Sequence, residues 1–407
     1  MTKLIKEAEI LLPNVEDMTA FACVACDQFT SQPKYWEELE KLTENKPSAL
    51  NLIFPEIYLT KKGDEKIEEI NATMKEYLDK GIYKSVGNGY ILTIRSTPFT
   101  KRRIGLIAAL NLDEYSFKKG EKPLIRATEA TIEERIPSRV KIRQNASIEL
   151  PHIMMLIDDD KKEIIEGLYE NREKYEKVYD FDLNQNGGHL TGYFIPKGDE
   201  FIKKFNKLSN KEELIRKYGK EEKFIIAVGD GNHSLATAKT CWENIKKNTP
   251  FYKRINHPQK YALVEIVNLY DEGLKFEPIY RYVTGVDAEK FLSELSVGGT
   301  DKTRVFAGDK EVEISFEDDV ALGISKLDKF IKEYIAKNGG EVDYVHGEDY
   351  LKDLCKTNNA VGILIKPMDK NKLFKAVIEN GSLPKKTFSM GEAEEKRYYL
   401  EGRKIIK

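Results

Sequence analysis

The chain has 407 residues, of which 33% are charged and 41% are hydrophobic, and its formal net charge is −2. This length predicts two or three domains, and the balanced charge argues against a nucleic-acid partner. No apolar run approaches the roughly 18 residues of a membrane helix, and the N-terminus lacks the apolar segment of a signal peptide, so we expect a cytoplasmic protein without a membrane partner.

Residues 1–283 are predicted to form a large domain of mixed α/β structure. Its clearest helix has apolar side chains on one face and ends before Gly81. Pro137 should break or kink a later, charged helix. In chain order, the expected elements are a helix at 63–80, paired strands at 90–94 and 104–110, a helix at 129–145, strands at 153–157, 178–183 and 189–194, and buried strands at 224–228 and 261–269.

Residues 284–407 are predicted to form a smaller α/β unit, because helical and strand patterns alternate there at short intervals. The whole chain therefore belongs to the mixed α/β class, although the order of its strands cannot be inferred from the pattern. The expected elements are helices at 287–295, 321–338 and 371–379, a hairpin around residues 308–309, and strands at 341–345 and 361–365.

Two cysteines, Cys23 and Cys26, have the C-x-x-C spacing of redox and zinc sites. A zinc site needs a second pair of ligands, but Cys241 and Cys355 are isolated in the sequence. A free cysteine packs as a small buried hydrophobe. We therefore expect the two thiols to be structural, and we predict no metal-ligand cluster.

A strand, a polar loop and a helix follow one another at 224–239. Five apolar residues predict the buried strand, and an alanine-rich run after the loop predicts the helix. A strand that ends in such a loop directs the first free N–H groups of the next helix at an anion. The loop therefore predicts a phosphate or nucleotide site made by Gly229, Gly231, Asn232 and Ser234.

Two further residues of this loop could take part in catalysis. Asp230 could act as an acid or base or help to hold Mg²⁺, and His233 could act as a proton shuttle. The alternative is a structural turn, in which the glycines allow a positive φ and Asn232 or Ser234 caps the helix. The loop matches neither the lysine-containing phosphate loop nor the three-glycine dinucleotide fingerprint.

The loop resembles the "DGHHR" box of domain-of-unknown-function family 1015, a large prokaryotic group. It also resembles the phosphate-binding turn of the ParB-like and sulfiredoxin-like group, which includes free-serine kinases. These likenesses imply a ParB/sulfiredoxin-like core and phosphoryl chemistry. Further family matches occur in order along the chain: residues 25–29 resemble the "PYD" turn, 46–51 the "NPxSF" segment, 128–139 the "HExT…R" box, 267–274 the "N-x-x-D-x-GL" turn and 383–388 the "MPQKST" segment.

The chain departs from the family pattern at three positions. Asn232 and Ser234 stand where the loop of the family has its second histidine and its arginine, and Thr128 replaces the histidine of the other box. Without that arginine, the loop has no cation of its own for a phosphate. A non-catalytic metabolite-binding or regulatory protein with a degenerate phosphate loop is therefore the alternative to an enzyme.

A second group of charged residues lies at 126–143. Guanidinium groups bind phosphate or carboxylate, and a carboxylate among them could act as a base toward a hydroxyl group. The alternative is a set of ordinary ion pairs. The family match favours Glu129 as a catalytic base, with Arg126, Arg139 and Arg143 as phosphate-binding groups. A phosphate without a paired charge is costly to bury, so we expect at least one of these arginines beside the loop.

These features together predict a cytoplasmic enzyme of phosphoryl transfer that acts on a small metabolite. The likeness to free-serine kinases implies ATP or ADP as cofactor, together with Mg²⁺, and serine or phosphoserine as the first substrates to consider. In such chemistry the protein chiefly positions the phosphate and neutralises its developing charge. A homodimer is one assembly compatible with this class.

Overall fold

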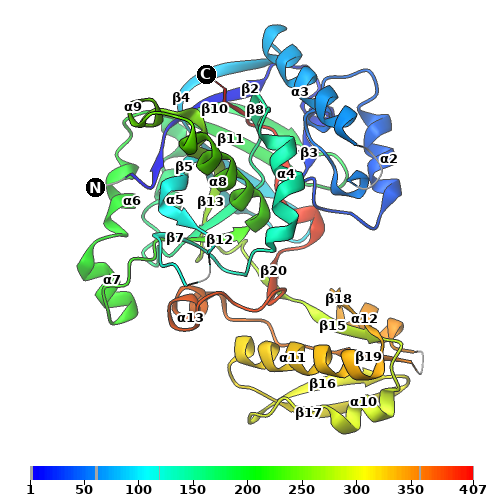
Figure 1. The fold of residues 1–407 in the computed structure, drawn as a ribbon. Coiled ribbons are helices and arrows are strands. Elements are labelled where there is room, and N and C mark those ends of the chain that lie inside the picture. The colour runs from blue at the N-terminus through cyan, green and yellow to red at the C-terminus, as the bar shows by residue number, and fades with distance from the viewer. Residues whose placement is uncertain (1–2, 60–62, 119, 357–358, 407) are drawn as a thin grey trace. The chain divides into compact units, whose positions relative to one another are not determined.

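The computed structural model of the protein describes residues 3–59, 63–118, 120–356 and 359–406. The chain forms two compact units (Figure 1). The main unit comprises Met1–Leu274 and Glu392–Lys407, and the second unit comprises Lys275–Gly391. The mixed α/β class expected from the sequence is confirmed, because both units combine helices with a β-sheet.

This division differs from the expected boundary between residues 283 and 284. The second unit begins earlier, and the last residues of the chain return to the main unit. They do so because β21 (Tyr398–Tyr399) pairs with β3 (Cys23–Val24) and β22 (Arg403–Lys404) pairs with β8 (Ile148–Glu149). Such long-range pairing leaves no periodic signal near the C-terminus, and the return of the chain to the main unit could therefore not be predicted from the sequence.

The main unit is built on one mixed sheet, to which eleven strands of the described residues contribute in the order β10-β11-β4-β5-β13-β9-β12-β7-β6, with β1 paired to β5 and β2 to β4. Neighbours are antiparallel except for the parallel pairs β13–β9, β12–β7 and β6–β7. The strands are β1 (Ile5–Lys6), β2 (Ala8–Pro13), β4 (Tyr83–Ser96), β5 (Arg103–Asn111), β6 (Tyr115–Ser116), β7 (Ile125–Ala127), β9 (Met154–Ile157), β10 (Glu176–Asp182), β11 (His189–Pro196), β12 (Ile226–Asp230) and β13 (Tyr261–Asn268).

Both faces of this sheet are buried at its centre. Along β5, Leu106, Ala108 and Leu110 belong to one hydrophobic cluster, whereas Ile107 and Ala109 belong to another. Alternate side chains of a strand point to opposite faces, so a strand with two buried faces needs a continuous apolar run. The central strands that were predicted from continuous apolar runs are confirmed, and burial of both faces explains why those runs were present.

Helices cover the main sheet, and α4 packs against α8 beside the predicted loop (Figure 1). The helix predicted at 63–80 is confirmed as α3. The helix predicted at 129–145 is shorter than expected, because Pro137 lies in the first turn of α4, where its missing N–H is tolerated. The helices are α1 (Met18–Phe21), α2 (Pro33–Leu42), α3 (Asp64–Asp79), α4 (Ile136–Arg143), α5 (Ile165–Glu170), α6 (Phe201–Lys207), α7 (Lys211–Tyr218), α8 (Asn232–Lys247) and α9 (Phe251–Arg254).

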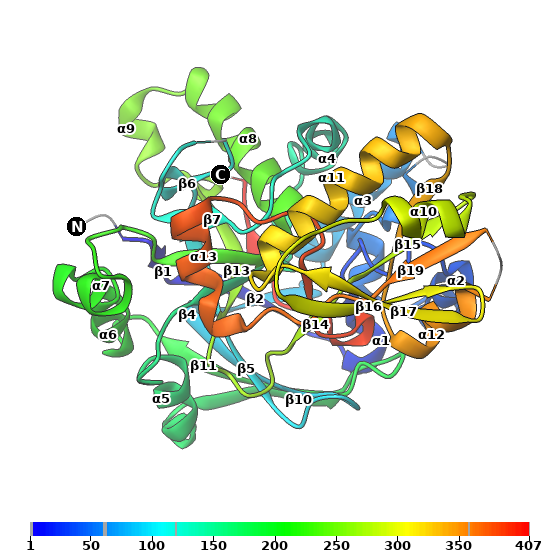
Figure 2. The ribbon, with the colours of Figure 1, turned by 90° about the horizontal axis from the view of Figure 1, so that it is seen from below.

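The second unit has a sheet of order β17-β16-β19-β15-β18. Helix α11 lies along one face of it (Figure 2), where Ile324, Leu327 and Ile331 pack against Val305 and Ile363. Its elements are β14 (Phe276–Pro278), β15 (Tyr280–Thr284), α10 (Ala288–Glu294), β16 (Asp301–Ala307), β17 (Lys310–Phe316), α11 (Val320–Asn338), β18 (Glu341–Val345), α12 (Glu348–Leu354), β19 (Ala360–Ile363), α13 (Leu373–Asn380) and β20 (Phe388–Met390).

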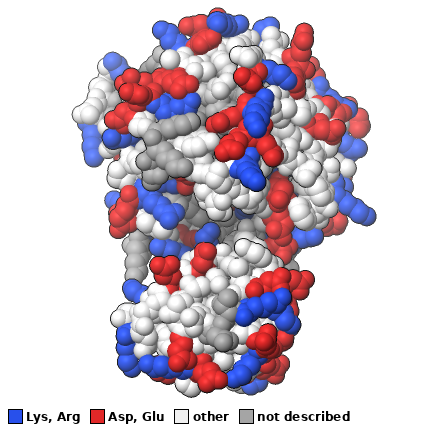
Figure 3. Space-filling model, turned by 90° about the vertical axis from the view of Figure 1, so that its right-hand side faces the viewer, with Lys and Arg blue, Asp and Glu red and all other residues white. Residues whose placement is uncertain are grey.

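One face of the molecule carries basic and acidic side chains in a mixed arrangement (Figure 3). On the face shown in Figure 3, lysines and arginines alternate with aspartates and glutamates, and no large area has one sign. Such a face lacks the basic patch that attracts nucleic-acid phosphates. Within the described part of the chain, no helix combines the length and the apolar character that crossing a membrane requires.

Candidate functional site

The predicted strand, loop and helix are present, with β12 leading directly into α8. The strand is interrupted by a bulge at Gly229, because Val228 pairs with Met155 and Asp230 pairs with the next residue, Met154. Bulges redirect the side chains that follow them. Gly231 then takes a left-handed conformation with φ 78° as the N-cap of α8, and no side chain caps the helix. The N-terminus of α8 is therefore held close to the sheet without a capping side chain.

Asp230 is held by a lysine that the sequence did not point to. Its carboxylate lies 3.1 Å from the Lys396 ammonium and also accepts a hydrogen bond of 2.8 Å from the Gly231 N–H. Burial raises the pKa of Asp230, but Lys396, the Gly231 N–H and His152 outweigh that effect, so the pKa lies below its usual range. Asp230 is consequently a carboxylate at neutral pH.

The Gly231→Ala substitution should destabilise the main unit. An added Cβ would meet the Ile153 backbone at 3.0 Å, and φ is unfavourable for alanine. Gly219→Ala is a matched control, since Gly219 has φ 72° with open space around it. We expect Gly219→Ala to lower the free energy of unfolding by about 1–2 kcal/mol. Gly231→Ala should lower it by about 1 kcal/mol more, measured by urea denaturation, because Ile153 must shift. Equal losses would contradict the close contact.

The Asp230–Lys396 ion pair should make stability depend on acid pH. Because the folded pKa is below the unfolded value of about 3.9, the contribution of Asp230 is complete above about pH 4 and is lost as the pH falls through the folded pKa. The difference in unfolding free energy between the wild type and Asp230→Asn should therefore shrink on acidification. In Lys396→Met this loss should begin at higher pH. If the difference in unfolding free energy between the wild type and Asp230→Asn did not vary with pH, the lowered pKa of folded Asp230 would be contradicted.

The two predicted segments meet at one edge of the sheet. Because β7 and β12 are parallel neighbours, their carboxyl ends lie together. The Thr128 hydroxyl donates to the Val228 carbonyl at 2.7 Å, and the Ile132 N–H donates to His233 Nε2 at 3.3 Å. Glu129, which is half-buried, lies between Thr128 and Ile132 in the sequence. One ring nitrogen of His233, the predicted proton shuttle, thus accepts a backbone hydrogen bond.

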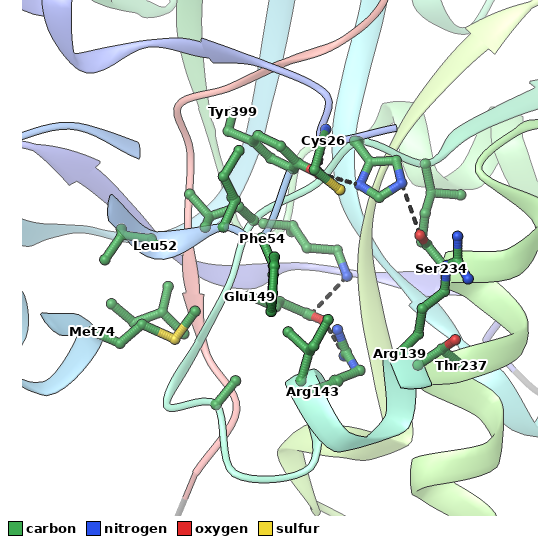
Figure 4. A pocket seen from close by; sticks show the side chains of 18 of the residues that line it. Cys26, Leu52, Phe54, Met74, Arg139, Arg143, Glu149, Ser234, Thr237 and Tyr399 are labelled. Atoms are coloured by element: carbon green, nitrogen blue, oxygen red, sulfur yellow. Dashed lines mark hydrogen bonds and ion pairs between the residues drawn. The ribbon is translucent and has the colours of Figure 1, made fainter. Parts of the chain in front are cut away.

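A cavity of about 150 Å³ opens beside the first turn of α8. Ser234 and Thr237 of that helix line it, and Figure 4 shows them on the same side as Arg139, with the apolar Leu52 and Met74 on the opposite side. Its remaining wall is largely aliphatic, with charged and polar groups at one end. The cavity therefore suits a small molecule that carries both an apolar part and a polar group.

Two of the three predicted arginines line this cavity. Arg139 and Arg143 lie one turn apart on α4 and thus share a helix face. Arg139 forms an ion pair with Glu56, which is also a lining residue. Arg126 does not line the cavity: its guanidinium bonds Glu222 at 2.6 Å, before the start of β12. That arginine lies toward the opposite end of the strand from the loop.

Glu149 in the wall of the cavity pairs with two arginines, Arg143 of the same wall and Arg403, which does not line the cavity. Arg143 and Arg403 both pair with this one buried carboxylate, which also accepts the Leu263 N–H at 2.8 Å. Two guanidinium groups and one carboxylate leave one positive charge. The buried Nε of Arg143 has no hydrogen-bond partner among the described residues. An anion in the cavity would supply both the missing charge and an acceptor.

His152, Tyr399 and Ser234 form a chain of hydrogen bonds that the sequence did not suggest. Ser234 Oγ lies 2.8 Å from His152 Nε2, and Tyr399 Oη lies 2.6 Å from His152 Nδ1. His152 follows Pro151 in the sequence and directly precedes the strand expected at 153–157. Its position immediately before a buried strand was the only available signal. Nothing near Tyr399 in the sequence indicated a site.

The loop also contains an acceptor without a partner. Within the described residues, the buried Oδ1 of Asn232 accepts no hydrogen bond. Asn232 is the first residue of α8, so its amide lies beside the uncapped helix end. Gly229 contributes only the bulge, and Gly231 contributes the N-cap and one N–H that is already bonded to Asp230.

The fold and the site define a mixed α/β protein with a strand–loop–helix next to a charged cavity. The chain belongs to the family described as protein of unknown function (DUF1015), whose model matches residues 10–404. This confirms the resemblance found in the sequence. No curated protein matches the chain.

Among solved structures, the likenesses are distant. Free serine kinase in complex with AMP is 12% identical, with a TM-score of 0.39, over 77% of this chain and 95% of that one. SbnI with a C-terminal truncation, from Staphylococcus aureus, is 9% identical, with a TM-score of 0.36, over 70% of this chain and 82% of that one. A conserved hypothetical protein from Pyrococcus furiosus is 13% identical, with a TM-score of 0.35, over 73% and 90%.

Proposed function

We propose that this protein is an enzyme of phosphoryl transfer that acts on a small hydroxylated or phosphorylated metabolite. The observation that carries the proposal is that two arginines, Arg143 and Arg403, share the single carboxylate of Glu149, and that Arg143 and Glu149 line the cavity. A phosphate oxygen would complement the second arginine of this cluster, and the unpaired Nε of Arg143 is a donor for it. The uncapped N-terminus of α8 adds a favourable dipole.

The size of the cavity limits the part of the substrate that is buried. A volume near 150 Å³ accommodates a group about as large as benzene, so the adenine and ribose of a nucleotide would remain outside. Serine and phosphoserine fit this limit and are the first substrates to test. ATP or ADP would serve as phosphate donor with only its terminal phosphate at the cavity.

Mg²⁺ would have to rely mainly on the phosphates of the donor. The described part of the chain contains no group of three or more His, Cys, Asp or Glu side chains arranged to hold a metal. Asp230 is the nearest carboxylate of the loop, but Lys396 already pairs with it. A magnesium–nucleotide complex is compatible with such a site, because Mg²⁺ commonly takes one or two carboxylates plus phosphate oxygens.

The proposal is tested by following phosphorus directly. Purified protein is incubated with ATP or ADP, Mg²⁺ and serine, and separately with phosphoserine and other small phosphate esters, and phosphorus-31 NMR records the products. We expect a new phosphate ester or free phosphate, and a loss of at least about 100-fold in Arg143→Met. Arg216→Met, on exposed α7, is the control and should leave the rate unchanged. The proposal would be refuted if no substrate gave a product and no nucleotide stabilised the protein thermally.

The second candidate is a non-catalytic metabolite-binding or regulatory protein. Two observations favour it: Ser234 replaces the family's arginine, and the charges of Asp230 and Arg139 are already paired with Lys396 and Glu56. Such a protein would bind phosphoserine or a nucleotide without consuming it. Binding, measured by calorimetry, should then survive Asp230→Ala, whereas product formation in the wild type would exclude this candidate.

A further inference from the structure

We propose that Ser234 is a nucleophile, that His152 is its general base, and that the serine carries the phosphoryl group between two substrates. This inference rests on the proposed function and adds a covalent intermediate to it. The geometry that points to it is the 2.8 Å contact between Ser234 Oγ and His152 Nε2 at the wall of the cavity. A nucleophile in contact with a base that a third group orients is the general arrangement for covalent catalysis.

Tyr399 contacts both His152 and Cys26. The Tyr399 hydroxyl donates to Cys26 Sγ at 3.2 Å, and its oxygen accepts from the Cys26 N–H at 3.4 Å. In the tautomer that this proposal requires, His152 Nδ1–H donates to the Tyr399 oxygen across the 2.6 Å contact, and the Tyr399 proton goes to Cys26 Sγ. In that tautomer Nε2 carries a lone pair, which accepts the Ser234 hydroxyl proton.

The groups behind the histidine keep this arrangement at neutral pH. Burial raises the pKa of Tyr399 well above its usual range, and burial raises the pKa of Cys26 to about 12. Neither group therefore loses its proton, and Tyr399 acts as a positioning residue for His152. The same pKa explains why Cys26, although it lines the cavity, is not itself a thiolate nucleophile.

The surroundings also stabilise the charges that the reaction would create. Ser234 is in the first turn of α8, where the helix dipole favours a developing negative charge on Oγ. Asp230 pairs with Met154, two residues after His152, and its carboxylate would stabilise the imidazolium. Both His152 and Ser234 are partly exposed, so a substrate in the cavity can reach them.

The reaction has two balanced steps. In the first, Ser234 Oγ forms a bond to phosphorus while His152 Nε2 takes its proton, and the bond from phosphorus to the leaving oxygen of a phosphate ester or anhydride breaks. The leaving oxygen keeps the electron pair and receives the proton from His152. In the second, a substrate hydroxyl or water gives its proton to His152 and attacks phosphorus, and Ser234 Oγ leaves and takes that proton back. The phosphorylated form of Ser234 exists only between the two steps.

The test uses a fluorophosphonate, which replaces its fluoride with an activated serine oxygen, on the full chain. Intact mass and peptide mapping should find one label, on Ser234, and none in Ser234→Ala. His152→Asn should slow labelling by on the order of 100-fold. Tyr399→Phe should slow it less but shift its pH profile, because Nδ1 loses its acceptor. Thr240→Val removes another hydroxyl of α8, one that already donates to Ala236 at 2.8 Å, and should change nothing.

The outcomes separate this inference from the proposed function. A protein that transfers phosphoryl groups but is not labelled at Ser234, or that is labelled equally in His152→Asn, would overturn the nucleophile and leave the proposed function intact. Labelling of Ser234 in a protein that consumes no phosphate compound would support the nucleophile and overturn the proposed function. Trapped phosphoserine at residue 234 after incubation with a phosphate donor would support both. Melting curves confirm that each variant is folded.

Discussion

Glu149→Gln is expected to lower the free energy of unfolding by about 3–5 kcal/mol, the usual loss when one member of a buried ion cluster is removed. Glutamine keeps the size of the side chain but has no negative charge, so Arg143 and Arg403 would face each other without a counter-ion. The Leu263 N–H would keep an acceptor only if the amide oxygen points toward it. Urea unfolding at pH 7, followed by fluorescence, measures the effect.

An exposed ion pair of the same helix is the control for this prediction. Lys141 of α4 lies 3.6 Å from Asp64, and both side chains are largely exposed. Asp64→Asn should therefore change the free energy of unfolding by less than about 1 kcal/mol. If Glu149→Gln lowered the free energy of unfolding by no more than Asp64→Asn does, the two arginines would not depend on the buried carboxylate.

Asp230→Asn is expected to reduce the rate of phosphoryl transfer by on the order of 100-fold or more, while substrate binding changes little. The Asp230 charge acts on the His152 ring, and the amide cannot stabilise an imidazolium. Asparagine has the same shape as aspartate, so the loop before α8 should keep its conformation. Turnover is measured by phosphorus-31 NMR and binding by calorimetry, on the same preparations.

Asp182→Asn is the matched control for that prediction. Asp182 also contacts a histidine, His189 Nδ1 at 2.7 Å, but both are outside the cavity. Its substitution should leave turnover unchanged. Loss of binding together with turnover in Asp230→Asn would assign Asp230 to substrate binding instead. Unchanged turnover would remove it from the mechanism.

The parts of the fold that were predicted correctly are those encoded by nearby residues. Helix α3 could be read from the apolar face formed by Ile70, Met74 and Tyr77, and β5 from an uninterrupted apolar run. The step from β12 to α8 was visible because a glycine-rich loop separates two segments of different apolar pattern. The sequence could also place Arg139 and Arg143 together, since they are four residues apart in one helix.

The contacts that complete the site could not be predicted in this way. Ser234 and His152 are 82 residues apart, Tyr399 and His152 are 247 apart, and Lys396 and Asp230 are 166 apart. The pairing of β12 with β9 and of β21 with β3 brings these segments together, and apolar patterns do not encode which strands pair. Arg126 illustrates the same limit, because its strand ends at the loop whereas its side chain reaches the other way, to Glu222.

The position of the second unit within the chain has a consequence for synthesis. Lys275–Gly391 interrupts the main unit, so the ribosome completes the second unit before it adds β21 and β22. A domain that is contiguous in sequence can fold as it emerges. The main unit must instead wait, with β3 and β8 lacking their partners, until β21 and β22 have been made. A nascent chain therefore lacks the contacts of Lys396 with Asp230 and of Tyr399 with His152 until its last residues are added.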